Sequence, residues 1–374
     1  MEDEEIKKPI IIDNGTGYIK AGFEGETEPK IVIPNQIGRP KLNGENKYDF
    51  YCGDDIKENR EKLRLTSPIE RGEVKNWDDM EIIFGHILCK LTDCQEEHNV
   101  LVSEPTMNPK SQKEKITQMM FETFNISGLY IANQGVLSLL SYGIYNGISV
   151  DSGEGITQFV PMYDGKVLPY AINRIDFGGK DLTEYMEKLL MGKIFPIEKE
   201  KEIAKDIKEK ACYIPYNLED EISKVESLDY KLPDGSSILI KDQRIECPEA
   251  LFDPSLTYKD YDSIAKICND SIKMCKESFQ KELYNNILLT GGNTLFEGFE
   301  DRFRREIFSL AKPSFQEHVR IVPIFDKKER KFAVWIGGSL LSNILPKVEK
   351  GWITKTDYEE NGSDIVHKKC KEFN

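Results

Sequence analysis

The sequence predicts an α/β protein built from two similar halves, and three observations support this fold class. Strand-like apolar runs alternate with stretches of helical periodicity along the chain. The segment 10–17 (IIIDNGTG) recurs in outline as 148–155 (ISVDSGEG), so Asp13 and Asp151 each open a turn of the form Asp-x-Gly-x-Gly. These aspartates lie 138 positions apart (151 − 13), which is the spacing expected of a duplicated domain.

Elements of the first half follow from apolar alternation, which predicts strands, and from helical spacing, which predicts helices. The expected strands are 10–12, 18–23, 30–33, 99–103 and 129–132, and the expected helices are 77–91, 109–124 and 134–143. The closing region 332–339 predicts a buried helix that packs closely at its glycines.

In the second half the same order of elements repeats. Strands are expected near 156–172, a helix opening at 179, another over 198–212 and a hairpin turn at 232–235. Within 198–212, Ile203, Ile207 and Ala211 share one face at helical spacing. Lysine- and asparagine-rich stretches at 41–49 and 257–262 are typical of surface loops.

Composition limits the classes of function. With 374 residues, two domains are expected. The net charge, 51 − 65 = −14, argues against a general binder of nucleic acid or anionic membrane. No run of about 18 apolar residues occurs, so no membrane span is expected. The acidic segment 2–5 is the opposite of a signal peptide.

Cysteine and histidine usage indicates reduced thiols and disfavours a zinc site. The chain has eight cysteines but no Cys-x-x-Cys pair, which favours free thiols in the cytosol. The four histidines, at 86, 98, 318 and 367, are not clustered in the sequence.

Each Asp-x-Gly-x-Gly turn lies between two strand-like runs, which is the pattern of a β-hairpin. The glycines let several backbone N–H groups converge, and such a group of amides binds phosphate oxygens. The leading aspartate repels phosphate but can hold a hydrated Mg²⁺. One such turn alone is more often a hairpin without a ligand, whereas the pair indicates a clamp for a magnesium nucleotide.

A third glycine-rich turn, Gly291-Gly292, follows the strand-like run 286–290 and precedes helical spacing over 296–307. A strand, two glycines and a helix N-terminus can bind an anion or the sugar of a nucleotide. The alternative is a turn that needs small residues only for packing.

At these residues the chain resembles the actin and actin-related protein family, and the resemblance runs almost end to end. The segment 295–299 is more similar to centractin than to conventional actin. The matching stretches are 13–17, 20–23, 38–40, 74–80, 133–139, 150–153, 206–210, 290–292, 335–339 and 365–370.

This resemblance implies the actin-like ATPase fold, a duplicated ribonuclease-H-like α/β architecture with two lobes around a nucleotide cleft. The first lobe would comprise 1–140 plus 335–374, with a smaller subdomain inserted at about 33–68. The second would comprise 141–334, with an insertion at about 180–270.

The resemblance also implies a site for ATP or ADP with Mg²⁺ or Ca²⁺. Asp13 and Asp151 would hold the metal through water, and Gln134, Asp151 and Gln158 would take the catalytic positions. A glutamine such as Gln134 can orient an attacking water. The residues assigned to nucleotide binding are Gly15, Thr16, Gly17, Lys20, Gly153, Glu154, Gly155, Gly179, Lys205, Lys208, Glu209, Gly291, Gly292, Leu295, Phe296 and Lys331.

Three departures from the family pattern affect the expected function. Gln158 stands where actins have a histidine, which predicts slow or altered ATP cleavage because an amide does not titrate near neutral pH. The loop 41–51 is short and polar where actins dock into a neighbouring subunit, and 258–262 is charged where actins have an apolar plug. Polymerisation is therefore less well supported than nucleotide binding.

Three functions remain open from the sequence. The first is a cytoskeletal filament subunit that slowly hydrolyses ATP, and the second is a fixed ATP-bound subunit of a dynactin-like, ciliary or nuclear assembly. The third is a sugar or acetate kinase, for which no substrate-specific base follows Asp151. Partners would be actin-family subunits, or proteins at a groove near Leu140, Gly143, Leu341 and Ile344, in the cytoplasm and cytoskeleton.

Overall fold

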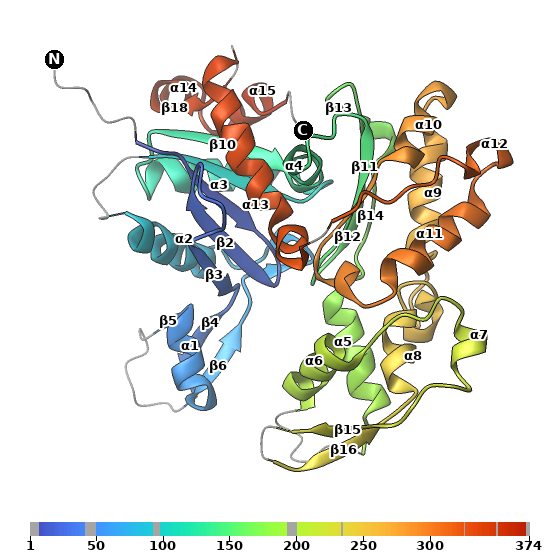
Figure 1. Ribbon diagram of the computed structural model, residues 1–374. Coiled ribbons are helices and arrows are strands. Elements are labelled where there is room, and N and C mark those ends of the chain that lie inside the picture. The colour runs from blue at the N-terminus through green and yellow to red at the C-terminus, as the bar shows by residue number, and fades with distance from the viewer. Residues whose placement is uncertain are drawn as a thin grey trace. The chain divides into compact units, whose positions relative to one another are not determined.

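A computed structural model describes residues 7–41, 50–92, 98–192, 200–232, 235–324, 326–348 and 351–371. The chain divides into two compact units (Figure 1). Unit 1 is Met1–Tyr145, Asp164–Val167 and Lys331–Asn374, and unit 2 is Asn146–Tyr163 and Leu168–Arg330. The acidic segment 2–5, most of the loop at 41–49 and the centre of the turn at 232–235 lie outside the described residues.

Unit 1 is built on a six-stranded sheet in the order β18-β10-β9-β1-β2-β3. Central strand β1 pairs antiparallel with β2 and parallel with β9, and its isoleucines are buried. All five strands expected in this half are confirmed. The bounds are β1 (Ile10–Asn14), β2 (Tyr18–Phe23), β3 (Ile31–Pro34), β9 (Asn99–Glu104), β10 (Gly128–Asn133) and β18 (Ile353–Thr354).

Helices of unit 1 lie beside this sheet, and the predicted ones are confirmed (Figure 1). Helix α13 is anchored by Trp335, which is fully buried and donates its Nε1–H to the Ile11 carbonyl oxygen at 3.2 Å. The bounds are α2 (Trp77–Leu91), α3 (Lys110–Glu122), α4 (Gln134–Ser141), α13 (Lys327–Ile344), η6 (Leu345–Lys347), α14 (Lys355–Asn361), η7 (Ser363–Ile365) and α15 (Val366–Lys369).

A smaller sheet in the order β5-β4-β6 belongs to the same unit. Arg39 on β4 forms an ion pair with the buried Asp79 on α2, which ties the small sheet to the helix. The elements are β4 (Ile37–Pro40), β5 (Tyr51–Cys52), α1 (Asp54–Asn59), η1 (Arg60–Lys62), β6 (Leu63–Thr66), β7 (Ile69–Glu70) and β8 (Glu73–Val74).

Unit 2 repeats the central pattern of unit 1. Strand β11 pairs antiparallel with β12 and parallel with β17, and β12 also pairs with β14. The bounds are β11 (Gly147–Ser152), β12 (Thr157–Tyr163), η2 (Pro169–Ala171), β14 (Asn173–Ile175) and β17 (Ile287–Thr290). Strand β13 (Lys166–Val167) belongs to the same sheet, but its residues are counted in unit 1. A hairpin of β15 (Leu228–Lys231) and β16 (Ser237–Ile240) confirms the hairpin expected around 232–235.

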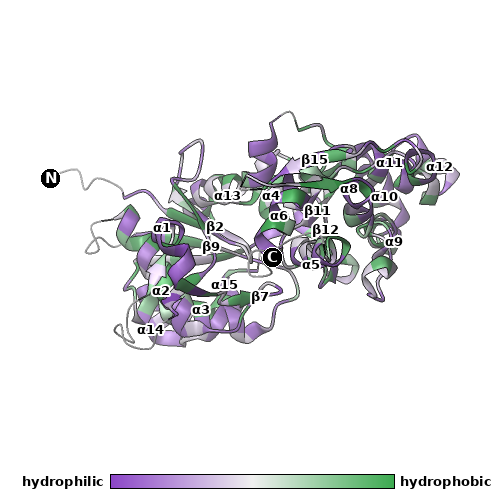
Figure 2. Ribbon diagram, turned by 90° about the horizontal axis from the view of Figure 1, so that it is seen from below, coloured by the Kyte–Doolittle hydropathy of each residue, from purple (hydrophilic) through white to green (hydrophobic). Residues whose placement is uncertain are grey.

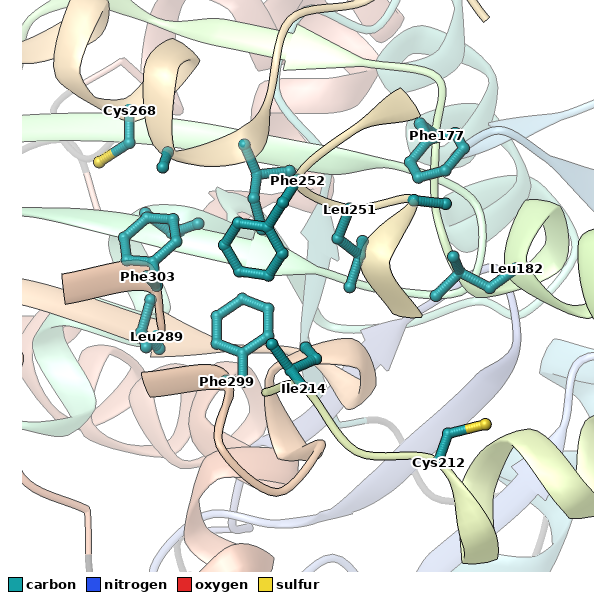
Figure 3. Packing of buried hydrophobic residues seen from close by; sticks show 14 of the residues in the cluster. Phe177, Leu182, Cys212, Ile214, Leu251, Phe252, Cys268, Leu289, Phe299 and Phe303 are labelled. Carbon is teal, nitrogen blue, oxygen red and sulfur yellow. The ribbon is translucent and has the colours of Figure 1, made fainter. Parts of the chain in front are cut away.

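The core of unit 2 lies between its strands and helices. Figure 3 shows Phe252, Phe299 and Phe303 facing one another, with ring centroids 5.8 Å apart for the first pair and 5.7 Å for the second. Figure 2 shows hydrophobic residues along the strands and hydrophilic residues along outer helices such as α11 and α12. The helices are α5 (Gly179–Leu189), α6 (Glu200–Ala211), α7 (Leu218–Glu221), α8 (Gln243–Glu249), η4 (Pro254–Thr257), α9 (Ile264–Met274), α10 (Glu277–Asn285), η5 (Gly292–Leu295), α11 (Phe299–Leu310) and α12 (Pro313–Gln316).

One predicted helix begins at a different residue in the structure. The helix predicted over 296–307 is α11, which begins at Phe299, and a short 3₁₀ helix, η5, begins before it at Gly292. Gly298 precedes α11 with φ +79°, and a Cβ there would lie 2.0 Å from the Ile214 carbonyl oxygen. This left-handed residue separates the two helices, so the predicted helix is present but begins at Phe299 instead of Phe296.

In the portion of the chain that the structure describes, no helix has the length and apolarity of a membrane span.

Candidate functional site

Asp13 lies near the end of β1 in unit 1, and its two carboxylate oxygens are held from two sides. The Ser103 hydroxyl donates to Oδ1 at 2.8 Å, and the Lys20 ammonium donates to Oδ2 at 2.6 Å. Asp13 is only 2% exposed. A buried carboxylate held in this way has a fixed direction, because each oxygen already has a defined donor.

Ser103 connects this carboxylate to Gln134. The Ser103 oxygen accepts from the Asn14 backbone N–H at 2.9 Å and from the Gln134 amide Nε2 at 3.2 Å. Gln134 is the first residue of α4, whose N-cap is Asn133, and the Asn133 side chain accepts from the Gly135 N–H. The start of α4 therefore places the Gln134 side chain within the hydrogen-bond network of Asp13.

The turn after Asp13 is fastened by Asn35, which is fully buried. Its Nδ2 donates to the Gly15 carbonyl oxygen at 2.9 Å, and its backbone N–H donates to the Gly17 carbonyl oxygen at 3.0 Å. The Thr16 hydroxyl accepts from the Gly72 N–H at 3.1 Å. Because the two glycine carbonyls are engaged by Asn35, the conformation of this turn is fixed by hydrogen bonds.

Asp151 in unit 2 is held in the same manner as Asp13. The Thr290 hydroxyl donates to Oδ1 at 3.2 Å, and the Gln158 amide donates to Oδ2 at 3.0 Å. Gln158 is the cross-strand partner of Asp151 in the β11–β12 hairpin, as Lys20 is of Asp13 in β1–β2.

The hydroxyl donors are equivalent as well. Thr290 is the parallel-strand partner of Asp151, and Ser103 follows Val102, the parallel-strand partner of Ile12. Both units thus present an aspartate between a hydroxyl from the parallel neighbour and a long polar side chain from the antiparallel neighbour.

The second turn is fastened by Asn293 and by the start of α5. Asn293 Nδ2 donates to the Ser152 hydroxyl at 3.0 Å and to the Gly153 carbonyl oxygen at 2.8 Å. The N–H groups of Gly179 and Lys180 donate to the carbonyl oxygens of Gly153 and Glu154 at 2.9 Å and 2.8 Å. The structure therefore brings the expected site residues of this turn together with Gly179.

The glycine pair of the third turn has two distinct environments. Gly291 has φ +84°, and a Cβ there would lie 2.3 Å from the Ser152 carbonyl oxygen, whereas a Cβ on Gly292 would meet nothing within 4 Å. Gly292 opens η5, which ends at Leu295, and Phe296 packs against the hydrophobic core of unit 2. Gly291 is thus required by the close approach of the backbone, and Gly292 borders open space.

Besides Lys20, the three lysines that are expected to bind the nucleotide differ in their burial and in their contacts. Lys208 on α6 is only 3% exposed, and its ammonium donates to the Gly179 carbonyl oxygen at 2.8 Å and to the Thr183 hydroxyl at 2.9 Å. Lys205 and Glu209 form an ion pair on the same helix at 3.9 Å. Lys331 belongs to unit 1, where its ammonium lies 5.5 Å from the centre of the Tyr18 ring.

Sequence reasoning missed Ser103, Asn35, Thr290 and Asn293. A signal was available for two of them: Ser103 closes the predicted strand 99–103 and Thr290 closes the run 286–290. Polar residues at the carboxyl ends of parallel strands commonly face a ligand. Asn35 and Asn293 act through backbone contacts that no local pattern reveals.

Asp13 and the neighbouring Asn14 offer side-chain oxygen atoms, the ligand type that suits a hydrated divalent ion. Mg²⁺ and Ca²⁺ prefer oxygen ligands, and Mg²⁺ retains several waters. The buried Oδ1 of Asn14, next to Asp13, has no hydrogen-bond partner among the residues that the structure describes. That acceptor suits a water molecule bound to a cation.

The expected partner groove needs a correction. Leu341 is fully buried and Leu140 is only 7% exposed, so neither side chain is available for the partner contact expected of it. The exposed apolar side chains nearby in the sequence are Leu340, Ile344 and Tyr145. The helical register of α13 explains the difference, because adjacent residues of a helix point about 100° apart.

A comparison with protein families matches residues 4–371 to the family model described as Actin. The matched range includes nearly all of both units.

Proposed function

The chain belongs to the actin family, and from this premise we propose that it binds ATP with a hydrated divalent ion and hydrolyses the ATP slowly. One observation carries the proposal: the carboxylates of Asp13 and Asp151 accept hydrogen bonds from equivalent pairs of side chains on equivalent strands. Two buried or half-buried carboxylates, each with a fixed direction, are suited to the water shell of one cation.

Phosphate binding is proposed for the backbone N–H groups of the two aspartate-led turns. In unit 1 these belong to Thr16 and Gly17, with Lys20 as the nearby cation, and in unit 2 to Glu154 and Gly155. Gly15 and Gly153 shape the two turns, because their own N–H groups donate to the carbonyl oxygens of Asp13 at 3.2 Å and Ile156 at 3.0 Å. Convergent amides and one ammonium group stabilise a polyanion. For the nucleoside we propose Gly179, Lys205, Lys208, Glu209, Gly291, Gly292, Leu295, Phe296 and Lys331.

Hydrolysis is proposed to depend on Gln134. Its Nε2 donates to Ser103 and, at 3.4 Å, to the Asn14 carbonyl oxygen. With the amide nitrogen held in this way, the side-chain carbonyl keeps one direction and can accept a proton of the attacking water. The divalent ion, when bound, neutralises charge on the phosphate oxygens.

A comparison of binding with turnover tests this role. We expect Gln134→Ala to bind ATP with unchanged affinity, measured by calorimetry, while single-turnover hydrolysis slows by up to roughly 100-fold because the water is misplaced. Gln118→Ala, which alters a half-buried glutamine on α3, is the matched control. Equal hydrolysis rates in Gln134→Ala and wild type would contradict the proposed role.

We further propose that the chain assembles with actin-family subunits as a cytoskeletal component of the cytoplasm, in filaments or in a filament-like complex. Exposed Leu340 and Ile344 on α13 supply apolar area, each Å² of which contributes about 25 cal/mol when buried.

A fixed, non-polymerising subunit is the second candidate, and one surface feature favours it. Tyr258 is 91% exposed and is followed by Lys259 and Asp260 at the segment where actins carry an apolar plug. Sedimentation and negative-stain microscopy with Mg-ATP and salt distinguish the two. Long filaments from the pure chain support the filament subunit, and a soluble chain under all conditions supports the fixed subunit.

A further inference from the structure

Far along the chain from the aspartate-led turns, three side chains of unit 1 converge between α3 and the C-terminal helices. They are Glu114 on α3, Asp364 in η7 and His367 in α15, and their ligand atoms all lie within 4.8 Å of one another. Glu114 and His367 are 253 positions apart and are joined by a hydrogen bond of 2.7 Å between Oε1 and Nε2. The sequence disfavours a zinc site because its histidines are not clustered along the chain, but the fold brings His367 next to two acids, and we propose that these three residues form a binding site for a divalent transition ion of the zinc class.

The local geometry explains why the three groups meet. Asp364 and His367 are separated by three positions in the helical stretch from η7 into α15, so they share one face. That face packs toward α3, which presents Glu114. An acid and a histidine at this spacing are a recurrent ligand pair on helices.

The donor set is appropriate for zinc. One imidazole nitrogen and two carboxylate oxygens give three protein ligands, and a water completes a four-coordinate site. With bonds of about 2.0–2.1 Å, neighbouring ligand atoms in a tetrahedron lie about 3.3 Å apart. Glu114 and His367 therefore separate slightly on binding, and the proton that Nε2 donates to Glu114 in the absence of metal moves to Nδ1 or is released to water. Asp364, which is exposed, can rotate toward the ion.

The surrounding charges leave the two carboxylates available. The neighbouring Lys113 pairs with Glu104 at 3.3 Å, and Lys115 donates to Gln118 at 3.2 Å. Two carboxylates and a neutral imidazole carry a net charge of about −2, which a divalent ion neutralises.

A groove next to Glu114 gives access to the site. It encloses about 350 Å³ and is lined by Trp77, Gln112, Glu114, Gln118 and Ser363, among others. Ser363 precedes Asp364 in η7, so the groove reaches two of the three elements that supply ligands, α3 and η7. Water or an additional small ligand can therefore reach the open coordination position.

Metal binding fixes the C-terminal elements η7 and α15 to α3. In the absence of metal, one hydrogen bond from His367 joins α15 to Glu114, whereas metal coordination adds Asp364 and fixes three side chains at once. The conformational order of residues 363–371 therefore increases with metal concentration. This inference does not depend on the proposed nucleotide site.

Zinc titration of the full chain tests the proposal. The protein is used as purified, with free nucleotide removed and Mg²⁺ in excess, in a Cys89→Ser background, because Cys89 is the exposed thiol among the residues that the structure describes. Calorimetry is expected to show one zinc site, weakened by roughly tenfold or more in Glu114→Gln, Asp364→Asn and His367→Gln. Glu360→Gln and His318→Gln are the matched controls and are expected to bind zinc like the parent.

A second measurement uses the unaltered ligands, so it remains decisive if a variant fails to fold. Zinc is expected to protect His367, but not His318, from carbethoxylation by diethylpyrocarbonate, and to slow hydrogen exchange in 363–371. Zinc binding that all three ligand variants retain, or equal modification of His367 with and without zinc, would overturn the proposal.

Discussion

At the scale of single residues, the neighbours Gly291 and Gly292 are separated by a clear physical difference. Only Gly291 has a left-handed φ and a backbone oxygen within 2.3 Å of where a Cβ would lie. We expect Gly291→Ala to destabilise unit 2 by more than about 2 kcal/mol, measured by chemical denaturation. Gly292→Ala is expected to keep wild-type stability, because its Cβ would enter open space.

Substitution of Gly292 also tests whether this residue contributes to ATP binding. If Gly292 borders bound ATP as proposed, Gly292→Ala weakens ATP binding without loss of stability. A Gly291→Ala chain as stable as wild type would contradict the account of this turn.

Gln158 is the residue whose identity departs most informatively from the family pattern. It is fully buried and donates to Asp151 at 3.0 Å. We expect phosphate release by the wild type to be slow and flat between about pH 6 and 8, because an amide does not titrate there. Gln158→His is expected to accelerate release and to introduce a pH dependence, measured by a coupled phosphate assay. An unchanged rate of phosphate release in Gln158→His would contradict this explanation. Gln158→Asn is the control.

Residues of the candidate site differ in how well the sequence reveals them. Asp13 and Asp151 are found because the repeat places them in equal contexts. Ser103 and Thr290 are set by pairing between strands distant in the chain, and Asn35 acts on carbonyl oxygens about twenty positions away. Such contacts have no local periodicity, so the sequence alone does not identify them.

At the scale of elements, apolar periodicity identifies the strands and helices of the two central sheets well. The segment after Gly291-Gly292 is the exception. There the left-handed Gly298 immediately precedes α11, so the helix begins at Phe299 rather than at Phe296, although Phe296 already packs against the hydrophobic core of unit 2. Periodicity reports burial, and burial continues through such a break.

The C-terminal elements are held by Asp357, and this predicts a pH dependence. Burial raises the pKa of Asp357, but hydrogen bonds from Lys369 at 2.5 Å and from Thr354 outweigh burial and set the pKa below its ordinary value. A carboxylate with a lowered native pKa stabilises the fold above its unfolded pKa of about 3.9, and this stabilisation is lost as the pH falls through the native pKa.

Hydrogen exchange in α14 and α15 measures this effect. Protection is expected to be constant near neutral pH and to fall below about pH 4, after correction for intrinsic exchange rates. Asp357→Asn is expected to reduce protection at pH 7 and to remove the acid transition, whereas Glu360→Gln leaves both unchanged. An acid transition that persists in Asp357→Asn would assign it to another group.

At the scale of the whole molecule, the internal repeat has a structural counterpart. In each unit a strand whose second-to-last residue is aspartate pairs antiparallel with the next strand and parallel with a strand from later in the chain. The sequence predicts the repeat from one motif, and the topology extends it to the hydroxyl donors. The surface is harder to predict, as Leu341 shows, because exposure depends on the rotation of a helix by one residue.

The central claim is that Asp13 and Asp151 serve one nucleotide-bound cation. Calorimetry of Mg-ATP binding to wild type, Asp13→Asn, Asp151→Asn and the double variant tests it most directly. We predict one ATP per chain, a loss of roughly tenfold or more in each single variant, and a double variant that loses less than the sum, because residues serving one ion act as a unit. Absence of ATP binding, two ATP molecules per chain, or fully additive losses would contradict the account.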